Sequence, residues 1–468
     1  MIQSERVHGS SEGADRERGD HVLYWMQDAV RTEGNHALEY AIQEANTLKK
    51  PLIVLFSLTD QFPEATIRQY TFLVEGLIEV DHLLAERGIR LHVSLGDPVV
   101  SVPAAAEDAC LMVADCGHLR HQRQWRENVW ERVSCPKVMI ETGVIVPVVT
   151  ASPKMEWSAG TFRPKITRQL PRFLIPLPTI TLLYPSLGWD NGGLPFKTAE
   201  DLTSCLTLDQ TIPPVTSRGG EISAKAQLSW FTRERLHRYG DSHSDPTARA
   251  TSRLSSYLHF GQISPLSVAL EVMAAKSPGN ITFLEQLIVR RELAMNFVYY
   301  NPGYDSYDFA IPDWSKRTLS LHQNDIREYA YTRTELEVGV THDPYWNAMQ
   351  TELVLTGYLH GYLRMYWGKK ILEWSETPEE AFDTALFLNN RYELDGYDPN
   401  GYTGVAWCFG RHDRPWKERS IFGMVRYMND AGLKRKFKID AYRERVELMA
   451  AEKEDSILHH HEGMTSGD

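Results

Sequence analysis

The sequence has few cysteines, and their spacing suits neither a disulfide framework nor a metal cluster. Its 468 residues contain five cysteines, an odd number with no CxxC pair. A secreted fold stabilised by disulfides is therefore not expected, and a reducing compartment fits better.

Long apolar runs are missing as well. No stretch approaches the roughly 20 apolar residues that a membrane-spanning helix needs. Residues 1–20 are polar and lack the apolar centre of a signal peptide, so we expect a disordered tail there and a second polar tail at 456–468. His459, His460 and His461 could bind a metal, but a solvated terminus is the favoured interpretation, and we predict no metal site.

Positive charge is scarce overall but concentrated in one segment. The net charge of −12 argues against a protein that is coated with nucleic acid. Residues 411–438, however, hold nine Lys or Arg and three Asp or Glu, a local balance of +6. This segment is either a solvated basic face or a phosphate-binding surface. Trp416, Phe422 and Tyr427 interleave with the charges and slightly favour the second interpretation.

The first third of the chain alternates short apolar runs with helical patterns. The runs have the length of buried strands and cover residues 21–25, 51–58, 89–95, 110–115 and 137–141. The helical patterns lie near 35–49, 66–87, 98–108 and 119–133. This alternation predicts a doubly wound, Rossmann-like parallel sheet over residues 21–163. No GxGxxG follows the first strand, so the usual dinucleotide fingerprint is missing.

The remainder predicts a linker and then an all-helical domain. Prolines recur between 164 and 222, which indicates a long irregular connection. From 223 to 455 the strand patterns vanish: one helix is expected to end at Gly240, and a long apolar helix should cover 281–300. A capping box at Thr377 predicts the start of a further helix. The fold class is thus α/β plus all-α.

Glu292 is an unusual residue on the long apolar helix. Its neighbours one turn away include Ile288, Val289 and Met295. A carboxylate in such surroundings is costly unless it is paired. It is either a salt-bridge partner of an arginine or an acid that points into a cleft with a raised pKa.

Three further stretches carry candidate chemistry. Hydroxyls and free N–H groups in the run 251–264 suit a phosphate, although a plain helix cap is the alternative. The turn-rich segment 388–407 leads to Trp407, and a tryptophan beside a positive surface is expected where a nucleobase leaves its stack. Residues 360–374, HGYLRMYWGKKILEW, place Trp367 and Trp374 seven residues apart, roughly 10.5 Å along a helix.

Several of these segments together resemble the class II cyclobutane pyrimidine dimer photolyases of the photolyase/cryptochrome family. These flavoproteins repair UV-linked pyrimidines with blue light. The likeness spans roughly residues 21–445, and the long motifs occur in the family's order. The matching segments are TSRLSSYLHFGQIS, RRELAMNFVYYNPGYD, THDPYWNAMQ, GYLHGYLRMYWGKKILEWSE, LNNRYELDGYDPNGYTGVAW and HDRPWKERSIFGMVRYM.

The resemblance implies an α/β antenna domain, a linker and a helical domain that binds FAD. Arg364 and Asp395 would form an ion pair beside the isoalloxazine, and Asn389 would face flavin N5. An antenna chromophore, 8-hydroxy-5-deazaflavin or another pigment, is expected in the N-terminal domain. The implied FAD contacts are Tyr239, Thr251, Ser252, Arg253, Leu254, Ser255, Leu258, Arg364, Asn389, Asp395 and Gly396.

The resemblance also implies the substrate and the reaction. Reduced FAD would pass one electron to a flipped-out dimer, whose ring then splits. Glu292 would contact the bases of the dimer, and Trp407 would form a wall of its pocket. The expected partner is UV-damaged DNA, bound by a monomer in the cytoplasm or at a prokaryotic nucleoid. The implied DNA contacts are His243, Arg414, Arg426, Lys434 and Arg435.

One segment departs from the family's pattern. Residues 241–244 contain no Arg or Lys, so His243 or another group must fill the gap that a flipped dimer leaves.

The resemblance also implies a path for electrons. The tryptophans would carry an electron inward to the flavin, with Trp374 nearest to it, Trp346 in the middle and Trp367 outermost near solvent.

Two rival interpretations stay open. A cryptochrome-type blue-light receptor would share the cofactor and the scaffold, but Glu292, Trp407 and the basic segment favour repair. An unrelated helical DNA-binding module with a structural aromatic core would need no flavin at all.

Overall fold

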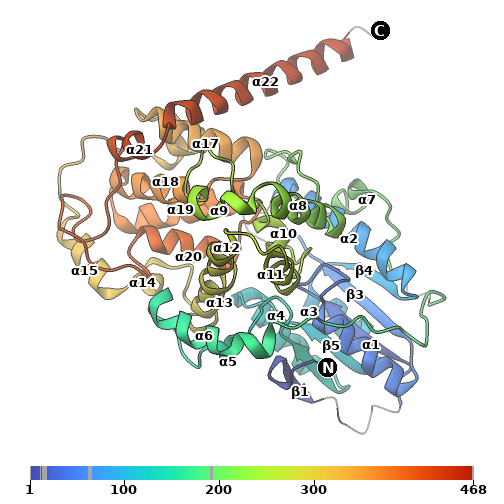
Figure 1. The fold of residues 1–468 in the computed structure, drawn as a ribbon. Helices are drawn as coiled ribbons and strands as arrows, with labels where there is room; N and C mark the ends of the chain where they lie inside the picture. Colours follow the sequence, from blue (N-terminus) through green and yellow to red (C-terminus); the bar gives the residue numbers. More distant parts are fainter. Residues whose placement is uncertain (1, 11, 13–17, 62–65, 190–192, 466–468) are drawn as a thin grey trace. The chain divides into compact units, whose positions relative to one another are not determined.

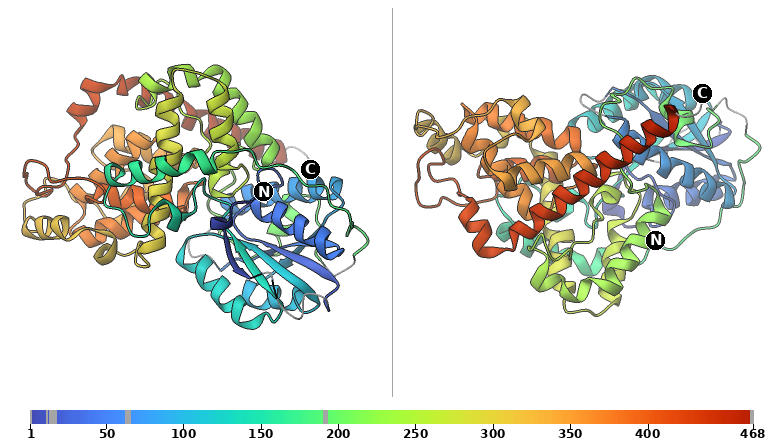
Figure 2. Two further views of the ribbon diagram at one scale, coloured as in Figure 1. Left: turned by 60° about the horizontal axis from the view of Figure 1, so that its bottom comes forward. Right: turned by 90° about the horizontal axis from the view of Figure 1, so that it is seen from above.

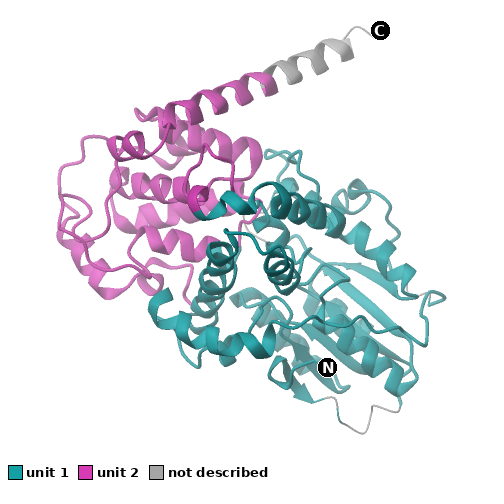
Figure 3. Cartoon of the chain, in the orientation of Figure 1, with its two compact units in different colours: residues 1–240, 252–302, 398–400 teal, residues 241–251, 303–397, 401–468 magenta. Residues whose placement is uncertain are grey.

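The computed structural model describes the backbone of residues 2–10, 12, 18–61, 66–189 and 193–465, and side chains as far as residue 453. The chain forms two compact units (Figure 3). Unit 1 comprises residues 1–240, 252–302 and 398–400, and unit 2 comprises 241–251, 303–397 and 401–468. The predicted helical domain from 223 onward is therefore divided between the two units. No helix in the described part of the chain is long and apolar enough to cross a bilayer.

Unit 1 is built on a six-stranded sheet with the order β1-β6-β5-β2-β3-β4 (Figure 1). All five predicted strands are confirmed, and neighbouring members of this set pair in parallel. Their bounds are β2 His21–Met26, β3 Leu52–Leu58, β4 Arg90–Leu95, β5 Ala109–Asp115 and β6 Lys137–Ile140. The chain steps from β4 at one edge back past β2 to β5, so the sheet is doubly wound as predicted.

Helices cover both faces of this sheet (Figure 2), and an apolar core lies on each face. On one face, Val22, Tyr24 and Met26 of β2 pack with α1 (His36–Leu48) and α2 (Ile67–Glu86). On the other face, Leu23 and Trp25 pack with α3 (Pro98–Ala105) and α4 (Arg120–Arg132). Alternate residues of a strand point to opposite faces, which explains why β2 is apolar throughout.

The expectation of a disordered tail over residues 1–20 is wrong for residues 4–10. Ser4–Arg6 form a 3-10 turn, η1, and Val7–Ser10 form β1, which pairs antiparallel with β6. Arg6 is fully buried and donates hydrogen bonds to the backbone oxygens of Glu141 and Val144. A buried guanidinium that finds carbonyl acceptors fixes this segment, which composition alone had indicated to be a solvated tail.

Helices complete unit 1, and the predicted linker is only partly irregular. The boundary at residue 163 falls inside α6, because Pro164 and Pro171 are accommodated within that helix. The remaining elements are α5 (Val148–Ala151), α6 (Ala159–Phe173), α7 (Ala199–Thr203), α8 (Glu221–Glu234), α9 (Leu236–Ser242), α10 (Ser255–His259), α11 (Pro265–Ala274), α12 (Asn280–Leu284), the π-helical turn η3 (Glu285–Arg290) and α13 (Arg291–Tyr300).

Two helix predictions need correction here. The helix expected to end at Gly240 is interrupted at Arg235 and continues as α9 to Ser242. The long helix over 281–300 exists, but the π-helical turn Glu285–Arg290 lies in its middle. A π turn inserts one residue, so side chains after it point in directions that a regular 3.6-residue period does not predict.

Unit 2 is helical, as predicted. Its elements are α14 (Tyr307–Ala310), α15 (Asp313–Leu321), α16 (Arg333–Val338), α17 (Pro344–Thr356), α18 (Gly361–Trp374), α19 (Pro378–Tyr392), α20 (Pro399–Cys408), α21 (Asp430–Lys436) and α22 (Ile439–Thr465). The predicted helix start is confirmed, since Thr377 accepts a hydrogen bond from the Glu380 N–H, which is one half of a capping box. Helix α18 packs against both α17 and α19. Helix α22 carries the backbone through Thr465, so the predicted polar tail is helical from 456 to 465, and the side chains of His459, His460 and His461 lie outside the described residues.

Candidate functional site

An ion cluster joins α18 to the segment that follows α19 in unit 2. The Arg364 guanidinium lies 3.5 Å from Oδ1 of Asp395, the expected partner. It lies closer, at 2.9 Å, to Oε1 of Glu393, which sequence reasoning missed. The Glu393 side chain is 2% exposed, and that of Asp395 is 10% exposed. Two carboxyl groups therefore face one guanidinium in a nearly dry environment.

Asn389 lies one helical turn before this cluster, because the backbone N–H of Glu393 donates to its carbonyl oxygen. The side chain is 1% exposed. Its Nδ2 donates to Oδ1 of Asn390 at 3.1 Å, but its Oδ1 has no hydrogen-bond donor among the described residues. Such a buried acceptor is rare unless a ligand or water supplies the donor. Asn389 is thus the strongest sign of a ligand site in unit 2.

Gly396 allows the chain to turn back beside Asn389. A Cβ at this position would lie 2.5 Å from the carbonyl oxygen of Asn390, so no larger residue fits without a shift of the backbone. The next residue, Tyr397, has a φ of +63° and donates its N–H to Oδ1 of Asn390 at 3.2 Å. This tight turn holds the asparagine pair in place.

Three buried tryptophans form a continuous chain of ring contacts. Trp346 and Trp367 stack with 6.3 Å between ring centroids and 2° between ring planes. Trp346 and Trp374 meet edge-on at 5.7 Å. Trp346 therefore bridges the two tryptophans of α18, as the resemblance implies.

The resemblance implies that Trp374 lies nearest to the flavin and Trp367 outermost, and this order stays a prediction. The rings at both ends of the chain are buried, with Trp367 1% and Trp374 2% exposed. Trp367 lies one turn from Arg364 on α18, and Trp374 is ten residues from Arg364, about 15 Å along the helix axis. The Trp374 ring contacts Tyr331 and His342, and His342 stacks at 3.5 Å on Tyr329, which is 39% exposed. Aromatic contacts therefore continue beyond Trp374 to a partly exposed tyrosine.

The expected phosphate-binding run is held in an irregular conformation. In unit 1, the Ser252 carbonyl oxygen accepts a hydrogen bond from Gln227 at 2.8 Å, and Arg253 has a φ of +55°. Leu254 is buried, and Ser255 starts the short helix α10, which contains Leu258. In unit 2, the Thr251 hydroxyl lies 3.0 Å from the Tyr358 hydroxyl.

Tyr239, another expected cofactor contact, belongs to an aromatic core within unit 1. It is 7% exposed, and its ring meets Phe231 and Phe283 edge-on at 5.7 and 5.3 Å. These contacts account for the burial of its ring.

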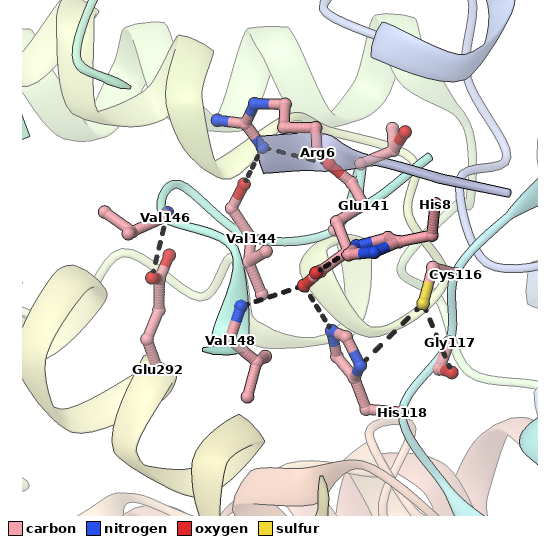
Figure 4. Close-up of polar contacts among 12 residues, drawn as sticks. Arg6, His8, Cys116, Gly117, His118, Glu141, Val144, Val146, Val148 and Glu292 are labelled. Atoms are coloured by element: carbon pink, nitrogen blue, oxygen red, sulfur yellow. Dashed lines mark hydrogen bonds and ion pairs between the residues drawn. The ribbon is translucent and has the colours of Figure 1, made fainter. Parts of the chain in front are cut away.

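Glu292 is held by backbone N–H groups of unit 1, and a contact with a dimer stays a prediction (Figure 4). The side chain is 2% exposed and accepts hydrogen bonds from the backbone N–H groups of Ile145 and, at 3.1 Å, Val146. Burial raises the pKa of Glu292 to about 7, although both N–H groups and the charge of Arg291 oppose the rise. Glu292 fastens α13 to the segment after β6, which is a structural role in unit 1.

A second buried carboxylate holds the same segment from the other side (Figure 4). Glu141 accepts hydrogen bonds from His8 at 2.8 Å and from the Val148 N–H at 2.9 Å. These contacts outweigh the effect of burial and lower the pKa of Glu141. No cluster of three His, Cys, Asp or Glu side chains among the described residues could hold a metal ion.

Trp407 lies near the end of α20, and a buried lysine stabilises that end. The Lys369 ammonium donates to the backbone oxygen of Cys408, the last residue of the helix. A cation at a helix C-terminus interacts favourably with the helix dipole. Burial nevertheless lowers the pKa of Lys369 to about 8. Trp407 itself is half-buried and meets the His412 ring edge-on at 6.0 Å.

The basic segment divides into a structural part and an exposed part. Arg411 is buried and donates to the carbonyl oxygen of Ala310 at 2.6 Å, so it is not available to a partner. Arg414 and Arg426 lie on the ring of Trp416, which is 42% exposed, at 5.5 and 5.2 Å. This arginine–tryptophan–arginine arrangement combines charge with an accessible aromatic face, as in surfaces that bind single nucleic acid strands.

The other expected DNA contacts are less tightly organised. Lys434 is exposed and pairs with Asp430 at 3.3 Å, and Arg435 is exposed on the same helix, α21. The backbone oxygen of His243 lies 3.0 Å from Nε2 of His360, and His243 is half-buried.

Several proteins of known function are similar in sequence to this chain. A family model described as DNA photolyase matches residues 22–182. A curated protein of Methanothermobacter thermautotrophicus named "Deoxyribodipyrimidine photo-lyase" is 51% identical, with 95% of this chain and 99% of that protein covered. One of the same name from Potorous tridactylus is 41% identical over 91% of this chain and 81% of its own length.

The fold has solved counterparts too. A structure titled as an archaeal photolyase from Sulfolobus tokodaii with two FAD molecules matches with a TM-score of 0.68. The match covers 90% of this chain and 89% of that chain, at 17% sequence identity. At this identity the likeness supports the fold: a parallel-sheet N-terminal part followed by helices.

Proposed function

Because the chain belongs to the DNA photolyase family, we propose that it repairs cyclobutane pyrimidine dimers in DNA and is of the class II subtype. Family membership and the names of its close relatives make the chain an enzyme, a photo-lyase that repairs UV-damaged DNA with light. The choice of cyclobutane dimers and of class II rests on the motifs in residues 251–264, 388–407 and 412–428.

The cofactor that this activity requires is FAD, and unit 2 has residues that fit it. The observation that carries the proposal is the buried Oδ1 of Asn389, an acceptor without a donor among the described residues. We assign the flavin ring to Asn389, Arg364, Asp395 and Gly396, and a phosphate contact to Thr251, all in unit 2. The phosphate contacts implied for Ser252–Ser255 stay a prediction. When bound, FAD supplies the light-driven one-electron chemistry that opens the cyclobutane ring. An antenna pigment in unit 1 stays a prediction.

The chain's own residues would bind and orient the flavin and would exclude water from its site. Asn389 would accept a hydrogen bond from the flavin, and Arg364 would offer a positive charge that its carboxyl partners keep in position. Trp374, Trp346 and Trp367 would connect the flavin to the surface in that order, as the resemblance implies. Each ring is in contact with the next, so no long gap interrupts the path.

The DNA would be bound through the exposed basic residues of unit 2. Arg414 and Arg426 are held on Trp416 by cation–π contacts and would meet the phosphate backbone. Trp407 would pack against a dimer that has left the duplex. Flipping a dimer is cheaper than flipping a normal base, because the distorted lesion stacks and pairs poorly.

The direct test is illumination of dimer-containing DNA with the purified, reduced protein. We expect dimers to disappear under blue light and to persist in the dark. An absorption spectrum of the same sample reports bound FAD. Bound FAD without loss of dimers would contradict repair and favour a cryptochrome-type receptor, whereas a protein that takes up no flavin would favour a helical DNA-binding module.

A further inference from the structure

The cluster at Arg364 contains more acid than base. Its guanidinium contacts Glu393 at 2.9 Å and Asp395 at 3.5 Å. Both carboxyls belong to the short segment after α19, where Glu393 and Asp395 are two residues apart. The Glu393 side chain is the more deeply buried of the two. If both acids were ionised, this cluster of three side chains would carry a net charge of −1. Excess charge in a dry environment is costly, because water cannot compensate it.

The two carboxyls also interact with each other. Oε1 of Glu393 and Oδ1 of Asp395 approach the same nitrogen, Nη2 of Arg364, at 2.9 and 3.5 Å, so the two carboxyls lie close to each other. Two neighbouring carboxylates repel each other, and a proton on one of them removes that repulsion. This is the arrangement in which two neighbouring acids hold a single proton.

The balance of forces on Glu393 points in the same direction. Burial is the largest influence and raises its pKa, the charge of Arg364 lowers it, and the charge of Asp395 raises it again. The net result is a pKa well above the ordinary value of a glutamate. Because the acids are coupled, the proton belongs to the pair and not to one oxygen.

We propose that Glu393 and Asp395 share one proton at neutral pH, so that their cluster with Arg364 is electrically neutral. Glu393 is then a positioning residue: it holds the guanidinium from a second side without adding a second negative charge. Asn389, one helical turn before Glu393, then lies near a neutral cluster instead of an anionic one. The consequence for a bound flavin rests on the proposed function, since a neutral cluster does not oppose negative charge on the cofactor. The protonation itself does not rest on it.

Infrared difference spectroscopy of the purified full-length protein tests the shared proton. At about pH 8, Glu292 and Asp115, with pKa values of about 7 and about 6, are mostly ionised and contribute little. We expect a protonated-carboxyl band that shifts in deuterated water and is lost in Glu393→Gln. The band should survive in the control Glu379→Gln, which removes an exposed carboxyl from the first turn of α19.

A second variant tests whether the proton is shared. In Asp395→Asn, the remaining Glu393 faces Arg364 alone and should ionise, so the band should disappear although Glu393 is present. A band that survives in Asp395→Asn would overturn the proposal, because burial alone would then hold the proton on Glu393. A band that survives in Glu393→Gln would overturn it as well.

The reduction potential of bound flavin provides an independent test of the charge of the cluster. In Glu393→Gln, ionised Asp395 and Arg364 balance each other, so the cluster stays neutral and the potential should stay at the wild-type value. The double variant Glu393→Gln/Asp395→Asn leaves Arg364 uncompensated and should raise the potential. A rise in the single variant Glu393→Gln would show that Glu393 was ionised and would refute the proposal. Failure of the proposed function would appear differently, as missing flavin or missing repair with the infrared band intact.

Discussion

Replacing Glu292 by glutamine tests whether its carboxyl has a structural role or contacts the substrate. The wild-type side chain is buried and accepts hydrogen bonds from two backbone N–H groups in unit 1. Burial raises its pKa from 4.5 to about 7. Between these two pH values the folded protein therefore holds a proton that the unfolded chain has released.

The sign and size of the effect on stability follow from this difference. Because the folded state binds more protons, the free energy of unfolding falls as the pH rises from 4.5 to about 7. The difference between 4.5 and about 7, at about 1.36 kcal/mol for each pH unit, amounts to about 3 kcal/mol. A glutamine cannot titrate, so Glu292→Gln should gain about that much relative to wild type between acid and neutral pH.

Urea unfolding of both proteins at several pH values measures this gain. The control is Glu285→Gln in the preceding π turn, where the hydrogen bond from Arg163 lowers the pKa of the carboxyl. A lowered pKa contributes stability at neutral pH that is lost on acidification, so this control should change in the opposite direction. A difference between Glu292→Gln and wild type that does not vary with pH would refute the reasoning.

Repair activity of the same variant decides the functional question. A carboxyl whose contacts are two backbone amides should tolerate glutamine with little loss of repair wherever the protein is folded. Strong loss of repair together with unchanged stability would return Glu292 to the role of a dimer contact. Glu292→Ala would be uninformative for this purpose, because it strands two buried N–H groups at about 1–3 kcal/mol each.

Three further variants test the assignments in unit 2. Trp346→Phe should slow photoreduction of the flavin far more than repair by protein that was reduced chemically beforehand, and equal photoreduction rates would show that electrons take another path. Arg414→Ala should weaken DNA binding and reduce the slope of log affinity against log salt by about 1, whereas the buried Arg411→Ala should lower the melting temperature instead. Gly396→Ala should reduce flavin affinity, because its Cβ would meet the Asn390 carbonyl oxygen at 2.5 Å, and wild-type affinity would argue against this turn as part of the cofactor site.

The α/β half of the fold could be predicted because its pattern is local. Strands that are buried on both faces are continuous apolar runs, and β2, β3 and β5 show this directly in the sequence. The edge strand β1 could not be found in this way. It consists of four residues, is half exposed, and is fixed by Arg6, whose acceptors lie about 135 residues away in the sequence.

The site residues show a similar limit. Motifs identified Arg364, Asn389 and Asp395, but Glu393 lies in the same motif and was passed over, because the resemblance supplied one acid for one base. Only the fold shows that both carboxyls reach the guanidinium. The order of the tryptophans meets the same limit, since spacing along α18 places Trp367 and Trp374 on one helix without indicating which of them lies nearer to the flavin.

Glu292 in unit 1 and Asn389 in unit 2 differ in one respect that sequence cannot reveal, namely whether the chain itself satisfies them. Glu292 was singled out because a carboxylate among apolar neighbours is costly, yet backbone N–H groups of its own unit meet both of its oxygens. Asn389 attracted attention only through a motif, yet its Oδ1 is buried without a donor among the described residues. A buried polar group that the fold satisfies stabilises the structure, whereas one that the fold leaves open favours the binding of a ligand or water. This difference is why we propose the cofactor site at Asn389 and the neighbouring Arg364 cluster, and why the repair assay of Glu292→Gln decides between a structural role and a dimer contact for Glu292.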